Sequence, residues 1–348
     1  MELGVFLLAG QFPGMTQAQA LGGAVDSAVA AERAGLASAW VAEHHFISYG
    51  VCPSAIALAA HLLGRTRRLQ VGTAVCMLAN RHPVALAEET ALLDHLGGGR
   101  FHLGVGRGGP WVDLEVFGTG LDRHQHGLAD SLDLLLAWLE RDRVGADGPR
   151  FRFREVTVVP RPATHPRPPV VVAATSPATV EAAAVRGLPL LLGLHTGDDD
   201  KAALLHRWRQ TAERYGHDPD AAGHLAAAVA QVADTTAEAQ ACLRAAMPQW
   251  LERGIGDYVS IDAAPRRRRD PRAYVEHLLQ IHPVGTPERC AQRLATSAER
   301  TGIRRFLLMV EGSGDHGRTL DNIARLGTEV APRLDRPRSP VEHGTAAQ

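Results

Sequence analysis

The chain has 348 residues, 45% of them hydrophobic, which is enough for one large domain or two medium-sized ones. Its 37 basic and 38 acidic residues leave a net charge of −1, so the composition excludes a global attraction to nucleic acid or to an anionic membrane. No apolar run is long enough to span a bilayer, and the opening MELG lacks the basic region of a secretion signal, so we expect a cytoplasmic protein. The four cysteines form no CxxC pair, so nothing indicates a disulfide framework or a zinc site.

Apolar runs alternate with helical patterns along the chain. The predicted strands are almost continuously hydrophobic, as expected of parallel strands buried on both faces, and span residues 3–9, 38–43, 69–75, 101–106, 170–174, 188–193, 225–232 and 305–310. The predicted helices span residues 17–35, 54–64, 83–96, 123–141, 177–186, 199–215, 235–252 and 287–301. This alternation predicts an α/β fold of the TIM (β/α)8 barrel type, with an open doubly wound sheet as the alternative.

Two segments interrupt the alternation. Residues 145–168 contain the alternating run FRFREVTVVPRP and predict an extra strand pair before strand 5. Residues 254–284 form an insertion between helix 7 and helix 8, and a long insertion on a barrel predicts a mobile lid. We therefore expect one barrel domain over residues 1–333 and a disordered tail over residues 334–348.

Polar side chains follow most of the predicted strands. The carboxyl ends of the strands meet at one mouth of a barrel, where active sites lie, so these side chains predict a ligand site. They are Glu43, His44, His45, Asn80, Arg81, His82, Arg107, Thr175, Ser176, Thr179, His195, Thr196 and Glu311.

Ser176 and Thr179 suit an anion site. Ser176 can cap a helix that begins at Pro177, which leaves free N–H groups and the positive end of the helix dipole at the barrel mouth. Arg107, one strand away, could donate to the same phosphate. The alternative is an ordinary capped helix beside a solvated arginine, and barrels bind phosphate more often after strands 7 and 8.

The run GVGRGGPW has glycine spacing similar to that of a dinucleotide-binding turn. Pro110 and Trp111 follow the glycines, however, where the dinucleotide motif requires a helix. We interpret the glycines as positions where a flat ligand approaches the backbone closely.

His44 and His45 end strand 2 beside Glu43. In a regular strand successive side chains face opposite sides, so one histidine should line the mouth and the other should turn outward beside Glu43. A zinc site needs about three convergent ligands, which this pattern does not supply, so no metal is expected. A histidine at the mouth can act as a general acid or base, and the alternative is a pair of satisfied polar residues at a strand end.

Helices 54–64 and 83–96 are unusually apolar for the outer layer of a barrel. Excess apolar surface on such helices predicts a homodimer interface.

Motifs along residues 1–333 resemble those of the bacterial luciferase-like flavin-dependent monooxygenases, and in particular the luciferase subunits. They are FLLAGQFPG, AWVAEHHF, LQVGTAV, HPVALAEETALLDHLGGGRF, LGVGRG, VVVAATSPATVEAAAVRGLPLLLG and HPVGTPERC. Each is weak alone, and their order and spacing together carry the resemblance.

The resemblance implies a two-component enzyme that binds reduced FMN at the barrel mouth. A separate NAD(P)H:flavin reductase would supply the FMN, and O2 would react through a C4a-(hydro)peroxyflavin to oxygenate a small organic substrate. His44 would be the catalytic acid or base, with Glu43 and His45 as its supports, and Ala74 and Val75 would lie under the isoalloxazine and share a cis peptide bond. The cofactor-binding set would be Ala74, Val75, Gly106, Arg107, Thr175, Ser176 and Thr179.

The chain also departs from the luciferase pattern. Gly106 stands where the light-emitting subunit has a cysteine, Thr175 stands where it has an acidic residue, and the insertion is shorter. We interpret Gly106 as opening space near the flavin. These changes argue against aldehyde bioluminescence and favour a larger substrate from secondary metabolism, such as an aromatic natural product. The alternatives are a deazaflavin-dependent oxidoreductase of the same superfamily and a non-catalytic flavin-binding subunit.

Overall fold

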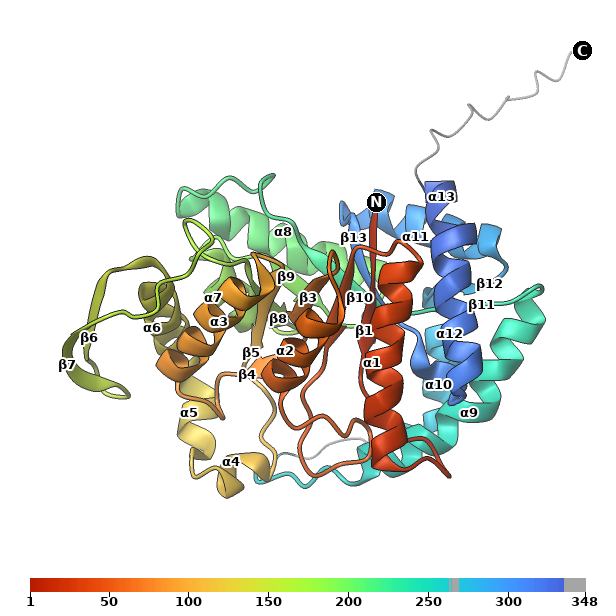
Figure 1. The fold of residues 1–348 in the computed structure, drawn as a ribbon, viewed down its shortest axis with the longest axis horizontal. Helices are drawn as coiled ribbons and strands as arrows, with labels where there is room; N and C mark the ends of the chain where they lie inside the picture. Colours follow the sequence, from red (N-terminus) through yellow and green to blue (C-terminus); the bar gives the residue numbers. More distant parts are fainter. Residues whose placement is uncertain (263, 265–268, 335–348) are drawn as a thin grey trace, which may run out of the picture.

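Eight parallel strands close a barrel in the computed structural model, which describes residues 1–262, 264 and 269–334. The strands pair in the order β1, β2, β3, β5, β8, β9, β10 and β13, and β13 pairs again with β1. Helices surround this ring (Figure 1), so the predicted TIM barrel is confirmed. The bounds are β1 Glu2–Leu7, β2 Ser38–Val41, β3 Gln70–Thr73, β5 Phe101–Gly106, β8 Val170–Ala174, β9 Leu190–Leu192, β10 Leu225–Val229 and β13 Arg305–Met309.

The helices begin and end at residues whose side chains favour those positions. Thr16 and Gln19 form a capping box at the start of α1, and Gly98 ends α3 with a left-handed φ of 60°. The bounds are α1 Gln17–Arg33, α2 Ala55–Arg65, α3 Pro83–Gly97, α4 Asp113–Val116, α5 Gly120–His126, α6 Leu128–Glu140, α7 Pro177–Ala184, α8 Asp198–Arg214, α9 Thr236–Gly256, α10 Pro271–Ile281, α11 Pro287–Thr301, α12 His316–Arg325 and α13 Ala331–Leu334. A short 3-10 helix, η1, spans Glu311–Ser313, and a π-helix, η2, spans Leu326–Val330.

Two helix predictions need correction. The predicted helix 123–141 is divided at Gly127 into α5 and α6. The helix that follows the last strand, α12, was not predicted; it begins at the N-cap Asp315 and packs against α1. Gly127 separates the two helices, and one glycine inside an apolar periodic pattern does not by itself mark a helix end.

Both predicted insertions contain defined structure. Strands β6 Arg143–Asp147 and β7 Arg152–Thr157 form an antiparallel hairpin that projects from the barrel (Figure 1), so the extra strand pair is confirmed. Residues 254–284 contain α10 and lead into β12 Val284–Gly285, which pairs with β11 Gln231–Val232. Residues 263 and 265–268 of the predicted lid and 335–348 of the predicted tail lie outside the described residues. No helix in the described part of the chain is long and apolar enough to cross a membrane.

Side chains fill the barrel interior. Trp40 of β2 is fully buried there, and Gly72 of β3 leaves room for it, because a Cβ at Gly72 would lie 2.5 Å from Trp40 Cδ2. Phe6 of β1 packs with Trp40 in the barrel interior. Its neighbours Val5 and Leu7 belong instead to the layer of apolar side chains between the strands and the outer helices. A barrel filled in this way can bind a ligand only at its mouth.

Candidate active site

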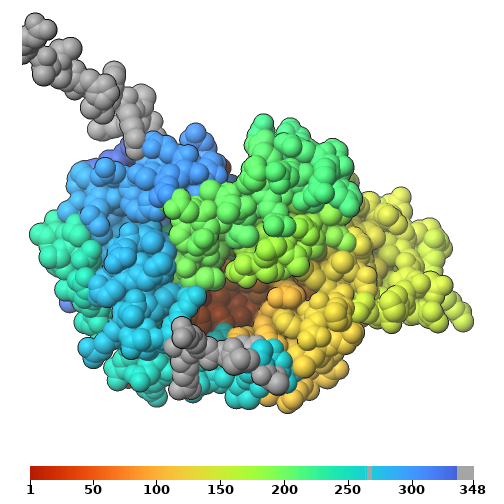
Figure 2. Space-filling view, turned by 180° about the vertical axis from the view of Figure 1, so that it is seen from behind, coloured from red at the N-terminus to blue at the C-terminus, as the bar shows by residue number. Residues whose placement is uncertain are grey.

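Glu43, His44 and His45 line a cavity of about 250 Å³ at the carboxyl ends of the strands. Ala74 and Val75 lie on another side of it. Figure 2 shows the molecule hollowed on this face, with red-brown N-terminal residues in the floor and yellow, green and blue segments around the rim. Both histidines line this cavity, and His45 also lies beside Glu43.

Glu43 is buried and connects three parts of the site. Its Oε2 atom accepts a hydrogen bond from the N–H of Ala55 at 3.0 Å and lies 3.3 Å from the Arg81 guanidinium. Its Oε1 atom lies 3.6 Å from Nε2 of His45. Burial alone would raise the pKa of Glu43, but His45, Arg81 and the Ala55 N–H together lower it, so the carboxylate stays charged.

His44 has a neutral imidazole at neutral pH. Part of the residue faces the cavity, yet its Nδ1 atom is buried and has no hydrogen-bond partner in the described part of the chain. Removal of water from the ring and the charge of His45 lower the pKa of His44 to about 4, although Glu43 opposes the shift. A neutral imidazole beside a cavity can accept a proton from a bound molecule.

The peptide bond between Ala74 and Val75 is cis, as the resemblance implied. The side chain of Val75 lies over β5, because a Cβ at Gly106 would lie 2.8 Å from Val75 Cγ2. Gly106 therefore does not open free space as expected, since Val75 occupies the volume beside it. The glycine permits a close approach of a protein side chain at this position.

Arg107, Ser176 and Thr179 follow neighbouring strands, because β5 pairs with β8. Ser176 caps α7, with its Oγ 3.4 Å from the N–H of Thr179 and 3.0 Å from Thr179 Oγ1. Thr175 is exposed and Thr179 is buried. Within residues 1–262, 264 and 269–334, the Arg107 guanidinium forms no ion pair, so this set retains donors for an anion.

The family model for luciferase-like monooxygenases matches residues 1–305 of the chain. The chain belongs to this family. It is 28% identical over 351 residues to the alkanal monooxygenase alpha chain of the Kryptophanaron alfredi symbiont, covering 96% of this chain and 98% of the relative. The predicted family and the prediction of an enzyme are confirmed.

Solved structures share the fold of this luciferase-like monooxygenase. Monooxygenase RslO1 from Streptomyces bottropensis has a TM-score of 0.83 and 22% identity, covering 95% of this chain and 99% of that one. The oxygenating constituent of 3,6-diketocamphane monooxygenase from Pseudomonas putida, in complex with FMN, has a TM-score of 0.77 and 19% identity, covering 97% and 99%. An F420-dependent secondary alcohol dehydrogenase has a TM-score of 0.73 and 19% identity, covering 96% and 99%.

Sequence reasoning missed several residues of the His44 cavity in this luciferase-like monooxygenase. Trp111 and Tyr258 line it with their ring centroids 4.6 Å apart, and they come from the loop after β5 and from the predicted lid. Asp113 also lines it and accepts a hydrogen bond from Asn80 at 2.6 Å. An aromatic residue two positions after the glycine run is the available signal for Trp111, whereas Tyr258 lies in a segment without periodicity.

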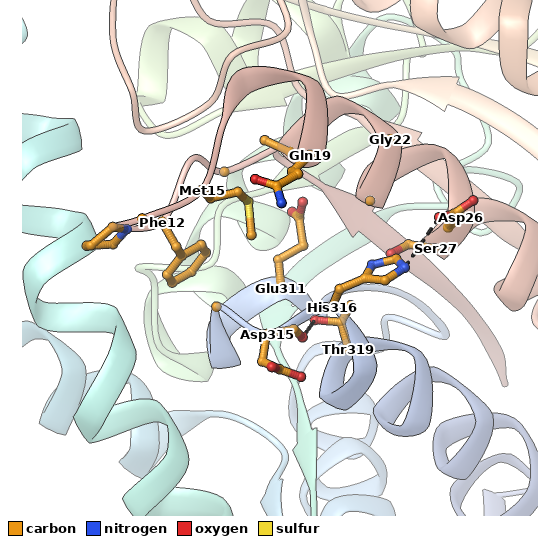
Figure 3. Close-up of a pocket in the computed structure, with 16 residues that line it drawn as sticks. Phe12, Met15, Gln19, Gly22, Asp26, Ser27, Glu311, Asp315, His316 and Thr319 are labelled. Carbon is orange, nitrogen blue, oxygen red and sulfur yellow. Dashed lines mark hydrogen bonds and ion pairs between the residues drawn. The ribbon is translucent and has the colours of Figure 1, made fainter.

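A larger cavity of about 540 Å³ lies outside the barrel, between α1 and α12 (Figure 3). Glu311, which was expected in the polar ring at the mouth, lines this cavity, and its Oε2 atom accepts a hydrogen bond from Leu8 N at 2.6 Å. Burial raises the pKa of Glu311 to about 7, although the N–H groups of Leu8, Gly10 and Ala9 oppose the rise. We place the candidate active site at the smaller cavity, since His44 and the strand ends meet there. In the described residues, no group of three or more His, Cys, Asp and Glu side chains could hold a metal ion.

Proposed function

We propose that the chain is the oxygenase of a two-component FMN-dependent system in the cytoplasm. It would take reduced FMN from a separate NAD(P)H:flavin reductase and use O2 to oxygenate a small organic substrate. The observation that carries the proposal is the neutral His44 imidazole in the mouth cavity beside the Ala74–Val75 peptide. The FMN complex of a protein with the same fold supports this choice of cofactor.

The residues at the mouth fit FMN. The hydroxyls of Ser176 and Thr179 lie 3.0 Å apart at the start of α7, and Arg107 at the end of the neighbouring strand would complete a phosphate site. Ala74 and Val75 would lie against the isoalloxazine, and Gly106 and Thr175 would belong to the same cofactor-binding set. When bound, reduced FMN supplies the electrons that activate O2.

The roles of the protein side chains follow from their positions. His44 would accept or return a proton at the cavity, because its imidazole is neutral and partly faces it. Glu43 and His45 would support His44, since Glu43 is anchored by Arg81 and by the start of α2.

The segment 258–261 is positioned to exclude water from the cavity. Val112 N donates to Val259 O at 2.9 Å, and Ile261 N donates to Pro110 O at 3.0 Å, so this part of the predicted lid pairs with the loop after β5. We propose that residues 254–262 and 269–284 of the predicted lid close over the bound cofactor and substrate.

The aromatic residues at the cavity support an aromatic substrate from secondary metabolism. Trp111, Tyr258 and Phe46 present ring surfaces there, against which a planar molecule could pack. Incubation with candidate metabolites, FMN, NADH and a generic flavin reductase, with mass spectrometry for the gain of one oxygen atom, would identify the substrate.

Replacement of His44 tests the proposed function. We expect His44→Ala to retain FMN binding and to lose oxygenation by about a hundredfold or more, the usual contribution of a general acid or base. Product formation and O2 consumption would be measured with reduced FMN in excess. His206→Ala, at an exposed position on α8, is the matched control. Full turnover by His44→Ala would remove His44 from the reaction.

The main alternative is an oxidoreductase that uses the deazaflavin cofactor F420. The shared fold with an F420-dependent alcohol dehydrogenase supports it. Titration of the purified protein with FMN and with F420 separates the two hypotheses. Tight binding of F420, hydride transfer to or from it, and no reaction with O2 would favour the alternative. The third reading, a non-catalytic subunit, is disfavoured because His44, Arg107, Ser176 and Thr179 are all present.

We propose a homodimer through the α2 and α3 side of the barrel. Leu92 and Leu96 of α3 are exposed by 50% and 72%, whereas most apolar residues of α2 are already buried within the chain. The contribution of α3 is therefore the better supported one. Sedimentation velocity of Leu96→Glu against the wild type tests it, and an unchanged sedimentation coefficient would contradict the proposal.

A further inference from the structure

Three aromatic rings form a continuous stack that ends at His44. The rings of Phe12 and Trp250 lie 4.7 Å apart with an interplanar angle of 17°, and the rings of Trp250 and Tyr49 lie 4.7 Å apart at 16°. The His44 imidazole meets the Tyr49 ring edge-on, with centroids 5.1 Å apart and an angle of 88°. We call Phe12, Trp250 and Tyr49 the aromatic column.

The column is held by close backbone contacts. Trp250 is 1% exposed and lies over Gly10, where a Cβ would come within 3.1 Å of the indole. A Cβ at Gly254 of α9 would lie 2.6 Å from Tyr49 Cα, so α9 packs directly on this residue. Phe12 is 4% exposed and lies beside the α9 helix at the edge of the larger cavity (Figure 3). Rings packed this tightly have little freedom to rotate.

The orientation of His44 depends on this packing. Its backbone N–H donates to Cys52 O at 3.0 Å, but its Nδ1 atom has no hydrogen-bond partner anywhere in the described ranges. A Cβ at Gly50 would lie 2.7 Å from Nδ1, so the backbone closes one side of the imidazole while Tyr49 contacts it edge-on. A histidine without a hydrogen bond to fix its ring must be oriented by its neighbours.

We propose that Tyr49 is a positioning residue for His44. Trp250, supported by Phe12, holds the Tyr49 ring in place, and that ring keeps the imidazole directed at the mouth cavity. This inference rests on the proposed function, in which His44 moves a proton. The phenol hydroxyl has no part in it, because the contact is made by the aromatic ring.

The proposal also connects His44 with the predicted lid. Trp250 and Gly254 lie on α9, which ends at Gly256 immediately before the segment that pairs with the loop after β5. The same helix therefore carries the column and leads into the lid.

Two substitutions at Tyr49 separate positioning from simple core packing. We expect Tyr49→Phe, which keeps the ring, to retain kcat within about twofold. We expect Tyr49→Leu to lower kcat by roughly tenfold to a hundredfold, the cost of a misplaced catalytic group, with a smaller change in KM. The pKa of His44, measured by NMR of histidine-labelled protein and assigned by the signal lost in His44→Ala, should rise from about 4 toward 6.5 in Tyr49→Leu.

The chain offers a matched control on the other side of the barrel. Trp208 is buried and contacts His224 edge-on, with centroids 4.5 Å apart and an angle of 87°. Trp208→Leu removes a similar edge-on ring from a histidine outside the site, whose Nδ1 accepts a hydrogen bond from Leu190 N at 3.0 Å. It should therefore lower stability without changing kcat.

The outcomes distinguish this proposal from the proposed function. A folded Tyr49→Leu protein with unchanged kcat and unchanged His44 titration would overturn the positioning role. Full turnover by His44→Ala would overturn the proposed function instead, and a changed His44 titration in Tyr49→Leu would still support the contact. If Tyr49→Leu does not fold, Tyr49→Met, which fills more of the volume with a flexible chain, takes its place under the same criteria.

Discussion

Arg107 belongs to the phosphate site of the proposed function, at the end of a barrel strand. It follows β5, its guanidinium has no ion pair in the described parts of the chain, and the neighbouring β8 leads to the cap residue Ser176. Arg107 is half-buried, so its guanidinium can donate to a ligand that enters the mouth. The phosphate of FMN has the charge and the acceptor atoms that this set of donors lacks.

At this scale we predict that Arg107→Ala weakens FMN binding selectively. Loss of a charge-assisted contact costs about 1.5–3 kcal/mol, which corresponds to roughly a tenfold to hundredfold rise in Kd. Riboflavin has no phosphate, so its affinity should not change, and fluorescence titration with both ligands gives the comparison. Arg152→Ala, in the exposed β6–β7 hairpin, is the control. An equal loss for both ligands would place Arg107 away from the phosphate.

Among the elements, the junction between β3 and β5 closes the barrel with few backbone pairs. Val71–Phe101 and Gly72–His102 are paired there, the Thr73 side chain makes the next contact, and the short strand β4, Cys76–Met77, pairs with β5 beyond it. The Oγ1 atom of Thr73 donates to Gly104 O at 2.8 Å and accepts from Gly104 N at 2.9 Å. Thr73 is fully buried and immediately precedes the cis peptide at Ala74, so the same contact also fixes the floor of the site.

We predict that Thr73→Val destabilises this junction. The substitution keeps the shape of the side chain and leaves a buried N–H and C=O without partners, which costs about 1–3 kcal/mol in the free energy of unfolding. Chemical denaturation measures the change. Thr328→Val, at an exposed position in η2, is the control and should differ from the wild type by less than about 0.5 kcal/mol. A Thr73→Val protein as stable as the control would show that water or a rearranged backbone satisfies Gly104.

For the whole molecule, buried histidines couple stability to pH. Burial lowers the pKa of His102 and His224 to about 4 and that of His282 to about 3, with smaller contributions from nearby cations. As the pH falls below about 6.5, these imidazoles take up protons in the unfolded chain but stay neutral in the folded chain. Glu311 acts in the opposite direction, because its raised pKa favours the folded state below about pH 7.

We predict that stability falls as the pH falls from about 6.5 to about 4. Between these pH values the unfolded chain binds several more protons on its histidines than the folded chain does. The Glu311 carboxyl offsets one of them, because it binds its proton in the folded chain first. The slope of the unfolding free energy should be at least about 1.4 kcal/mol per pH unit, the value for one net proton. Urea denaturation between pH 7 and 4.5 measures it, with His126→Gln as an exposed control and His102→Gln expected to reduce the slope. Constant stability across this range would contradict the prediction.

Much of the fold could be predicted from the sequence because its signals are local. Apolar runs located all eight barrel strands, and Ser176 with Pro177 located the start of α7. The family motifs implied the cis bond at Ala74, which the structure contains. These features depend on residues close together in the chain, whose spacing and capping chemistry can be read directly.

Only the tertiary structure decided how distant residues meet at the site. His44 and His45 line one cavity with Trp111 and Tyr258 from distant segments, and Val75 occupies the space beside Gly106. Phe12, Tyr49 and Trp250 stack although they lie on three separate segments of the chain. Periodicity reports which face of an element is buried, but the partner on that face is chosen by close packing between elements, which no local pattern encodes.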